Sequence, residues 1–169
     1  LFRSEIARIL GLNSVAERYA DIAKKMAMKW EEMANEGDHY RLAFDRNNTW
    51  SQKYNIIWDK MWNLNIFPNN IISKEINYYL TKQNLYGLPL DSRRDYTKSD
   101  WIMWTAAMSP NREIFEKFVD PLYKYINETT SRVPISDWHD TKTGRMTGFK
   151  ARSVIGGYWI QVLMDKMNH

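Results

Sequence analysis

The chain has 169 residues, a formal net charge of +4, and eight Trp, ten Tyr and six Phe. This length fits a single domain over residues 1–169, and 44% hydrophobic and 26% charged residues exclude disordered and collagen-like classes. Cysteine is absent, which excludes disulfides, zinc–thiolate sites and a thiol nucleophile. No run of like charges predicts a nucleic-acid partner, and no apolar run approaches the roughly 18 residues of a membrane span.

The N-terminal segment, LFRSEIARILGLN, has apolar residues at helical spacing but no small-residue cleavage site. It is therefore not a signal peptide. Since the chain does not begin with Met, we expect it to be a piece of a longer polypeptide. Ser14 and Glu17 then have the spacing of a capping box, and the apolar residues that follow predict a long helix from Val15 to near Gly37.

Five further helices are predicted by apolar residues three and four positions apart. They cover 54–62, 72–80, 98–109, 114–126 and 151–167. Pro121 is expected to kink the fifth helix of the six, because proline lacks the N–H that a helix interior requires. In the last helix, Gly156-Gly157 is expected to weaken the first turns or to allow a close helix contact.

Strands are not predicted, except for a short candidate over 132–135 that carries Pro134. The expected fold is therefore all-α and built from helical hairpins. The loops 38–53, 86–97 and 129–149 are long, whereas 64–71 and 109–111 are short. If consecutive helices run antiparallel, the three long loops lie at the same end, where long loops often form a functional site.

The segment from Tyr86 to Trp101 collects three Asp, two Arg and one Lys without an apolar helical face. It leads directly into a predicted helix, for which Thr97 is the expected N-cap with Asp100 three residues later. Free backbone N–H groups and the positive end of the helix dipole gather at such a position. On these residues alone, a well-capped helix after a polar turn is the preferred interpretation, because charged loops are often simply solvated.

Four ordered motifs resemble one known family. They are HYRLAFDRNNTWSQKYNIIWDKMWNLNIFP, YGLPLDSRRDYTKSDWIMWTAAM, RVPISDWHDTKTG and FKARSVIGGYWIQVL. In order and spacing they resemble the C-terminal domain of the fungal glutaminase A family and its bacterial relatives, from about Tyr19 onward. The chain departs from the family pattern at Met61-Trp62, Trp138-His139 and Arg152-Ser153, positions that bear on packing.

This resemblance implies an (α/α) toroid of the six-hairpin glycosidase-like type, of which six helices form about half. It also implies a larger multidomain protein that is exported, and hence an extracellular or periplasmic location. Because half a toroid leaves an apolar face uncovered, we expect this chain to contact neighbouring domains of its polypeptide or to self-associate.

Hydrolysis of an amide or a glycoside requires a proton donor and an activated water or nucleophile, which two carboxylates in different environments supply. The expected catalytic pair is Asp91 or Asp100 with Asp137, from two long loops. Arg93 and Arg152 are expected to bind a substrate carboxylate, with Lys98 orienting a neighbouring carboxylate. Tyr96 and Trp101 complete the predicted substrate-binding residues.

Structural roles compete with each of these assignments. Asp100 has the position of a helix cap, and Asp137 and Asp140 lie in a turn where Asp commonly bonds its own backbone. Asp59 lies in mid-helix as a candidate buried anchor, and Arg152 is expected to pair with a carboxylate.

The predicted function is a glutaminase-type amide hydrolase acting on a small-molecule substrate. A glycoside hydrolase or carbohydrate-binding toroid is the alternative, because the scaffold and the aromatic content suit sugars as well. A non-catalytic structural module is the third possibility. No cofactor and no metal are predicted, since the three His residues lack ligand spacing and no phosphate-binding loop occurs.

Overall fold

A computed structural model describes residues 2–167. Within this range the chain forms seven α-helices, two 3₁₀-helices and two short strands. In chain order these are α1 (Arg3–Ile9), α2 (Asn13–Ala34), η1 (Tyr54–Ile56), α3 (Ile57–Met61), α4 (Asn70–Leu80), β1 (Tyr96–Lys98), α5 (Ser99–Ala106), α6 (Arg112–Glu128), β2 (Trp138–Asp140), η2 (Ser153–Trp159) and α7 (Ile160–Met167). The fold is mainly α, as predicted.

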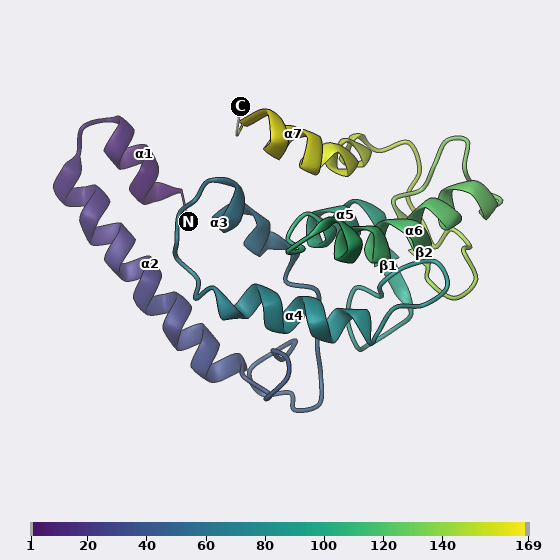
Figure 1. Ribbon diagram of the computed structural model, residues 1–169, viewed down its shortest axis with the longest axis horizontal. Coiled ribbons are helices and arrows are strands. Elements are labelled where there is room, and N and C mark those ends of the chain that lie inside the picture. Colours follow the sequence, from purple (N-terminus) through teal and green to yellow (C-terminus); the bar gives the residue numbers. More distant parts are fainter. Residues whose placement is uncertain (1, 168–169) are drawn as a thin grey trace.

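Helix α5 is the central element of the core. Its apolar Ile102, Met103 and Ala106 are buried, and so are its polar Ser99 and Thr105. Four other elements pack around it, namely η1, α6, η2 and α7. In Figure 1 the hairpin of α1 and α2 lies at one side of the molecule, away from α5 and α6. A residue on α5 is therefore enclosed by segments from distant parts of the sequence.

Hydrogen bonds connect the three long loops. Loop 38–53 is bonded to loop 86–97 through Gln52 N–H to Leu90 O at 2.8 Å, and Ser92 N–H to Trp50 O at 2.9 Å. Loop 86–97 is in turn bonded to loop 129–149. The Thr141 backbone N–H donates to Asp95 O at 2.7 Å in that contact. These bonds bring the charged residues of three separate segments to one region.

Two strand predictions are corrected. β1 and β2 pair antiparallel, with Lys98 opposite Trp138, although neither strand was expected. The candidate strand at 132–135 contains only an isolated bridge between its two ends. Thr97 is not the N-cap of α5, because Lys98 occupies that position, and Thr97 lies in β1 and is fully buried. Its hydroxyl accepts a hydrogen bond from Gln52 Nε2 at 3.3 Å, which explains the burial of a polar residue there.

The helix bounds also differ from prediction. α1 was not expected as a separate helix, and α2 begins at Asn13 with no side-chain cap, so the capping box of Ser14 is wrong. The predicted last helix is divided into η2 and α7, with Gly156 and Gly157 inside the 3₁₀ segment. Glycine disfavours regular α-helix, which accounts for the change in the first turns.

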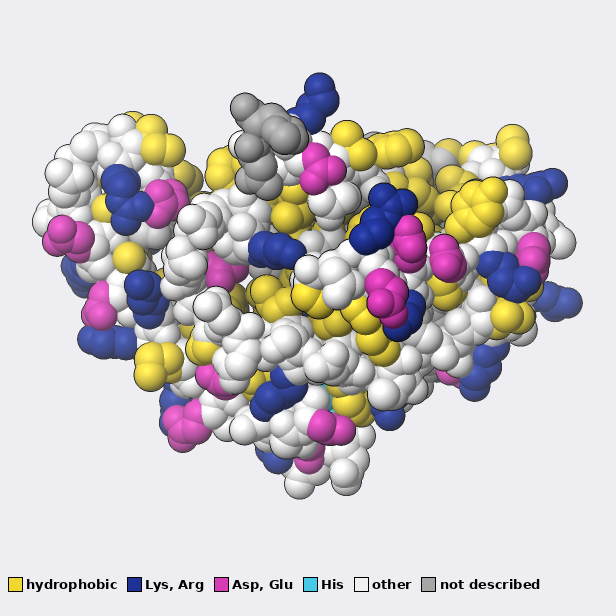
Figure 2. All heavy atoms as spheres, in the orientation of Figure 1, with side chains coloured by type: hydrophobic (Ala, Val, Ile, Leu, Met, Phe, Trp, Pro, Cys, Tyr) yellow, Lys and Arg dark blue, Asp and Glu magenta, His cyan; other side chains and the backbone are white. Residues whose placement is uncertain are grey.

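Apolar side chains remain exposed on two regions. On the α1–α2 hairpin, Ile9 is 83% exposed and Met26 is 68% exposed, although Met26 belongs to the predicted apolar face of α2. On η2 and α7, Trp159 is 68% exposed and Val162 is 49% exposed. In Figure 2, hydrophobic side chains reach the surface on the α1–α2 hairpin and along the upper edge near α7. Exposed groups of this kind are typical of surfaces that contact another part of a protein.

Candidate functional site

Asp100 occupies the first turn of α5 and is 5% exposed. Its Oδ1 atom has no hydrogen-bond partner among the described residues. Burial raises the pKa of Asp100 to about 6, the backbone N–H at the helix start acts against this rise, and the nearby charge of Asp137 reinforces it. A buried carboxyl group with a free oxygen atom and a pKa near neutrality can exchange protons with a ligand.

Asp137 lies beside Asp100 but has the opposite environment. It is fully buried, and the Arg152 guanidinium binds both of its oxygen atoms, with Nε 3.1 Å from Oδ1. Lys98 Nζ donates to Oδ2 at 3.1 Å. Burial alone would raise the pKa of Asp137, but the hydrogen bonds from Arg152 and Lys98 outweigh it and lower the pKa. Asp137 is therefore ionised and paired, and Arg152 pairs with a carboxylate as expected.

Two aromatic rings cover these cations. The Phe149 ring centre lies 4.3 Å from Lys98 Nζ and 4.0 Å from the guanidinium carbon of Arg152. Trp138 packs against Phe149 at 5.3 Å between ring centres, and its ring also contacts Lys98. Such cation–π contacts attract a positive charge to the face of the ring. They hold Lys98 and Arg152 in place beside Asp137.

The C-terminal segment closes the other side of this site. The Tyr158 hydroxyl on η2 donates to Ser99 Oγ at 2.6 Å, next to Asp100 in sequence. Gly157 lies directly against α5, since a Cβ atom built on it would be 2.8 Å from Trp104 Nε1 and 3.2 Å from Asp100 Cβ. Only a residue without a side chain fits at this distance. η2 therefore covers Asp100 and Trp104.

Asp91 and Arg93 form a separate pair. Arg93 Nε is 2.9 Å from Asp91 Oδ1, and Arg93 Nη2 is 2.7 Å from Oδ2, so the geometry is bidentate. Asp91 is buried, whereas the Arg93 side chain is 55% exposed. Both residues line a pocket of about 360 Å³ whose apolar wall includes Trp30 and Phe67. The structure thus places Asp91 with Arg93, and it places Asp100 with Asp137.

A stacked aromatic pair connects the two clusters. Tyr54 lines the pocket next to Asp91, and its ring stacks on Trp101 with 4.1 Å between centres and 8° between planes. Because Trp101 directly follows Asp100 in α5, this stack extends from the pocket to the start of that helix, and burial together with the charge of Asp100 raises the pKa of Tyr54. Tyr96 is half-buried and edge-on to Trp138 at 5.5 Å. All the predicted site residues therefore lie in or beside these two clusters.

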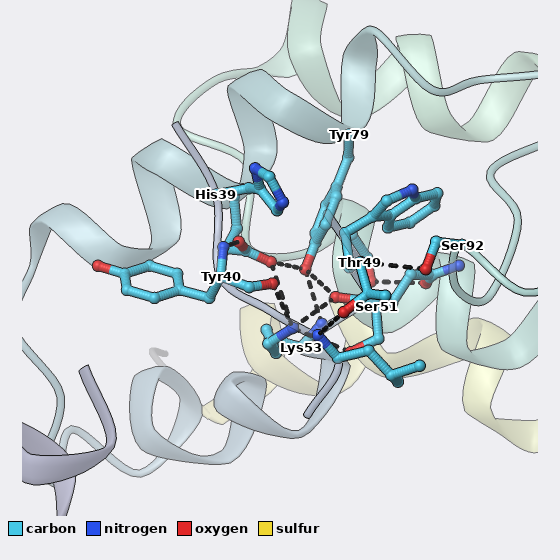
Figure 3. Close-up of polar contacts among 12 residues, drawn as sticks. His39, Tyr40, Thr49, Ser51, Lys53, Tyr79 and Ser92 are labelled. Atoms are coloured by element: carbon cyan, nitrogen blue, oxygen red, sulfur yellow. Dashed lines mark hydrogen bonds and ion pairs between the residues drawn. The ribbon is translucent and has the colours of Figure 1, made fainter. Parts of the chain in front are cut away.

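Sequence reasoning missed a buried ionic cluster beside the pocket (Figure 3). Lys53 Nζ donates to Tyr40 O at 3.1 Å and to Ser51 O at 2.9 Å, and it lies 3.9 Å from the Glu75 carboxylate. Tyr79 bonds to Glu75 through its hydroxyl, which also accepts the Lys53 backbone N–H at 2.7 Å. Burial raises the pKa of Glu75 and lowers that of Lys53. The sequence contained one sign of this cluster, because Glu75 lies among the apolar positions of α4.

Other candidates have structural roles. Asp59 accepts the backbone N–H groups of Ile66 and Phe67, each at 3.0 Å, and so anchors the turn after α3. Asp140 Oδ1 accepts the backbone N–H of Thr143 at 2.8 Å, as expected of Asp in a turn. Within residues 2–167, no group of three or more His, Asp or Glu residues is arranged to hold a metal ion. No helix in that range is both long and apolar enough to cross a membrane.

Comparison with known proteins identifies the family. A family model described as the glutaminase A six helical-hairpin domain matches residues 3–162. This chain belongs to the glutaminase A six helical-hairpin family. The predicted resemblance and the mainly helical fold class are thereby confirmed. The comparison with solved structures gave no significant match.

Two fungal members of the glutaminase A family illustrate the relationship. A protein named glutaminase A from Aspergillus oryzae is 31% identical over 166 residues, covering 94% of this chain and 24% of that protein. A protein named "probable glutaminase" from Arthroderma benhamiae is 26% identical over 195 residues, covering 96% of this chain and 22% of that protein. The chain thus spans about a quarter of the length of the relatives it matches.

Proposed function

We propose that this chain is part of a glutaminase-type amide hydrolase in which Asp100 is the catalytic carboxyl group. The names of the relatives support the reaction class. The observation that carries the assignment is the free Oδ1 of Asp100, in a residue that is 5% exposed. Asp91 and Asp137 are each bound by an arginine, so Asp100 is the predicted catalytic carboxylate with an atom free for a ligand.

Asp100 would act first as a base and then as an acid. With a pKa of about 6 it is mostly ionised at neutral pH. It accepts a proton from the water whose oxygen attacks the carboxamide carbon, and it then donates that proton to the leaving nitrogen. The C–N bond breaks, ammonia leaves and the substrate becomes a carboxylic acid. A single carboxyl group with a raised pKa suffices for both proton transfers.

Asp137 would be a positioning residue in this mechanism. Its negative charge raises the pKa of Asp100, and it holds Lys98 and Arg152 beside the site. Arg93 would bind the substrate carboxylate, because Asp91 fixes one edge of its guanidinium while more than half of the side chain is exposed. Arg152 and Lys98 would contribute positive charge next to Asp100.

The second candidate function is action on a carbohydrate. The stack of Tyr54 on Trp101 favours it, since both rings are only half-buried and lie near Asp100. Aromatic rings with one apolar face and a polar neighbourhood suit ligands that are partly apolar and partly wet. A sugar would then take the position of glutamine above Asp100.

The experiment measures two products from the native full-length polypeptide that contains this chain. Ammonia release is followed with L-glutamine, and reducing ends are followed with a panel of oligosaccharides. The variant Asp100→Asn is compared with Asp120→Asn, which makes the same change at an exposed position on α6. Positioned acid–base groups contribute about 10²–10⁴-fold to rate, so we expect Asp100→Asn to lower the rate by about 100-fold or more.

Each outcome separates the proposals. Ammonia release that is lost in Asp100→Asn and kept in Asp120→Asn supports the amide hydrolase. Release of reducing ends from oligosaccharides, lost in the same variant, supports the carbohydrate function instead. Full activity of Asp100→Asn on either substrate overturns the assignment of Asp100. If neither substrate reacts, the chain is better described as a non-catalytic module.

A further inference from the structure

Two buried polar atoms that have no hydrogen-bond partner within residues 2–167 lie one turn apart on α5. They are Oδ1 of Asp100 and Nε1 of Trp104. Residues four positions apart lie on the same face of a helix. Buried polar groups are nearly always hydrogen-bonded, so two such atoms on one helix face require an explanation. Neither atom bonds to the other, although one is a donor and the other is an acceptor.

Gly157 marks the place where the two side chains meet. A Cβ atom built on Gly157 would be 2.8 Å from Trp104 Nε1 and 3.2 Å from Asp100 Cβ. A Cβ atom built on the neighbouring Gly156 would have no atom within 4 Å. The indole ring of Trp104 is fixed on its other side by Trp58, which lies edge-on with 5.1 Å between ring centres. The Nε1 atom of Trp104 therefore lies directly against Gly157.

The chemistry of these two groups specifies their ligand. The indole N–H only donates, and an ionised carboxylate only accepts. A primary carboxamide has the complementary pair, since its oxygen accepts and its NH₂ group donates. We infer that Trp104 is a second substrate-binding residue, whose indole N–H donates to the carboxamide oxygen while Asp100 Oδ1 contacts the nitrogen side. This inference rests on the proposed amide hydrolase function.

The same N–H would stabilise the reaction. As water adds to the carboxamide carbon, negative charge develops on the oxygen, and a fixed donor aimed at that oxygen lowers the barrier. η2 covers both polar atoms, and Gly157 lies directly against Trp104 Nε1, so the inference requires η2 to move away from α5 before a carboxamide binds.

Trp104→Phe tests the inference because it removes the N–H and keeps an aromatic ring. Loss of one such donor lowers kcat by about 10²–10³-fold in other enzymes. We expect a fall in kcat for L-glutamine of about that size, with KM changed by less than about threefold, because the bond strengthens in the transition state. Trp62→Phe is the matched control, since it makes the same change at a tryptophan that is 52% exposed and has no role in the proposed site.

A pair of glycine variants provides a second test that does not alter Trp104. Gly157→Ala places a methyl group against Trp104 Nε1 and is expected to lower kcat/KM by at least tenfold, whereas Gly156→Ala meets no atom and is expected to retain it. Equal activity of the two glycine variants would overturn the inference. If Trp104→Phe fails to fold, as judged by circular dichroism, equal activity of the two glycine variants still overturns the inference.

The two proposals fail separately. If Asp100→Asn is inactive while Trp104→Phe keeps the wild-type kcat, Trp104 does not bind the carboxamide and the amide hydrolase proposal stands. If Asp100→Asn is fully active, the proposed function fails and the role of Trp104 fails with it. Loss of kcat in both variants, with activity kept in Trp62→Phe and Gly156→Ala, supports both.

Discussion

Replacing Asp137 with Asn removes the negative charge that Lys98 and Arg152 share. The carboxylate is fully buried and accepts three hydrogen bonds from these cations. An Asn side chain is nearly the same size, but it offers one oxygen atom and turns an NH₂ group toward a cation. The substitution therefore leaves a positive charge without its partner and changes the packing very little.

The size of the effect follows from burial. Removing one partner of a buried ion pair costs about 3–5 kcal/mol. The Arg152 side chain is 38% exposed and is partly rehydrated in the variant, whereas the Lys98 side chain is only 13% exposed. We therefore expect the lower end, about 3 kcal/mol. For a domain of this size each kcal/mol corresponds to roughly 2–4 °C, so the melting temperature falls by about 6–12 °C.

Thermal unfolding followed by circular dichroism at pH 7 measures this change, with Asp120→Asn as the exposed control. Because the folded pKa of Asp137 is lowered, its stabilisation is fully present above its ordinary value of 3.8 and is lost as the pH falls through the folded pKa. The difference between wild type and variant therefore narrows below about pH 4. A fall of less than about 2 °C at pH 7 would show that the ion pairs do not stabilise the fold.

Three further predictions concern Asp100, Lys98 and Asp59. Asp100→Asn is expected to keep or raise the melting temperature at pH 7.5, because ionising the buried Asp100 costs stability above its unfolded pKa of 3.8. At pH 3, where Asp100 is protonated, wild type and variant should have the same melting temperature. A lower melting temperature of the variant at pH 7.5 would contradict this. Lys98→Met moves the acidic limb of the kcat/KM profile from near pH 6 to higher pH, because the Lys98 charge lowers the pKa of Asp100; a shift to lower pH would refute this. Asp59→Ala leaves the backbone N–H groups of Ile66 and Phe67 without their acceptor. We therefore expect the unfolding free energy, measured by urea denaturation, to fall by about 2–4 kcal/mol. An unchanged urea midpoint would refute the anchoring role of Asp59.

The helices with clear apolar spacing were predictable. α4 and α6 were predicted over 72–80 and 114–126 and span 70–80 and 112–128, within two residues at each end. α6 begins where Asn111 caps it, with Oδ1 accepting the Ile114 N–H at 3.0 Å. In α2 the spacing correctly indicated a helix but not its environment. Periodicity shows which residues share a face, whereas the exposure of Met26 depends on what packs against that face.

The candidate site was predictable only in part. Asp100 with Asp137 was one of the two predicted carboxylate pairs, and the structure places Asp137 beside Asp100 and bonds it to Lys98 and Arg152. The position of Asp91 was not predictable, because bonds between loops 38–53 and 86–97 turn it toward another pocket. Partners that are far apart in sequence cannot be found by local spacing. Whether these residues catalyse a reaction stays a prediction.

The contacts that build the site join residues that are far apart in the sequence, which affects the order of folding. Asp137 is 39 residues from Lys98 and 15 residues from Arg152, and Tyr158 is 59 residues from its partner Ser99. Contacts between distant residues form slowly, because the intervening chain must first be ordered. During synthesis, α5 is complete long before η2 leaves the ribosome, so Asp100 remains open to solvent until the last of these segments arrives. We therefore expect the pKa of Asp100 to rise only when η2 packs against α5 and buries this carboxyl group.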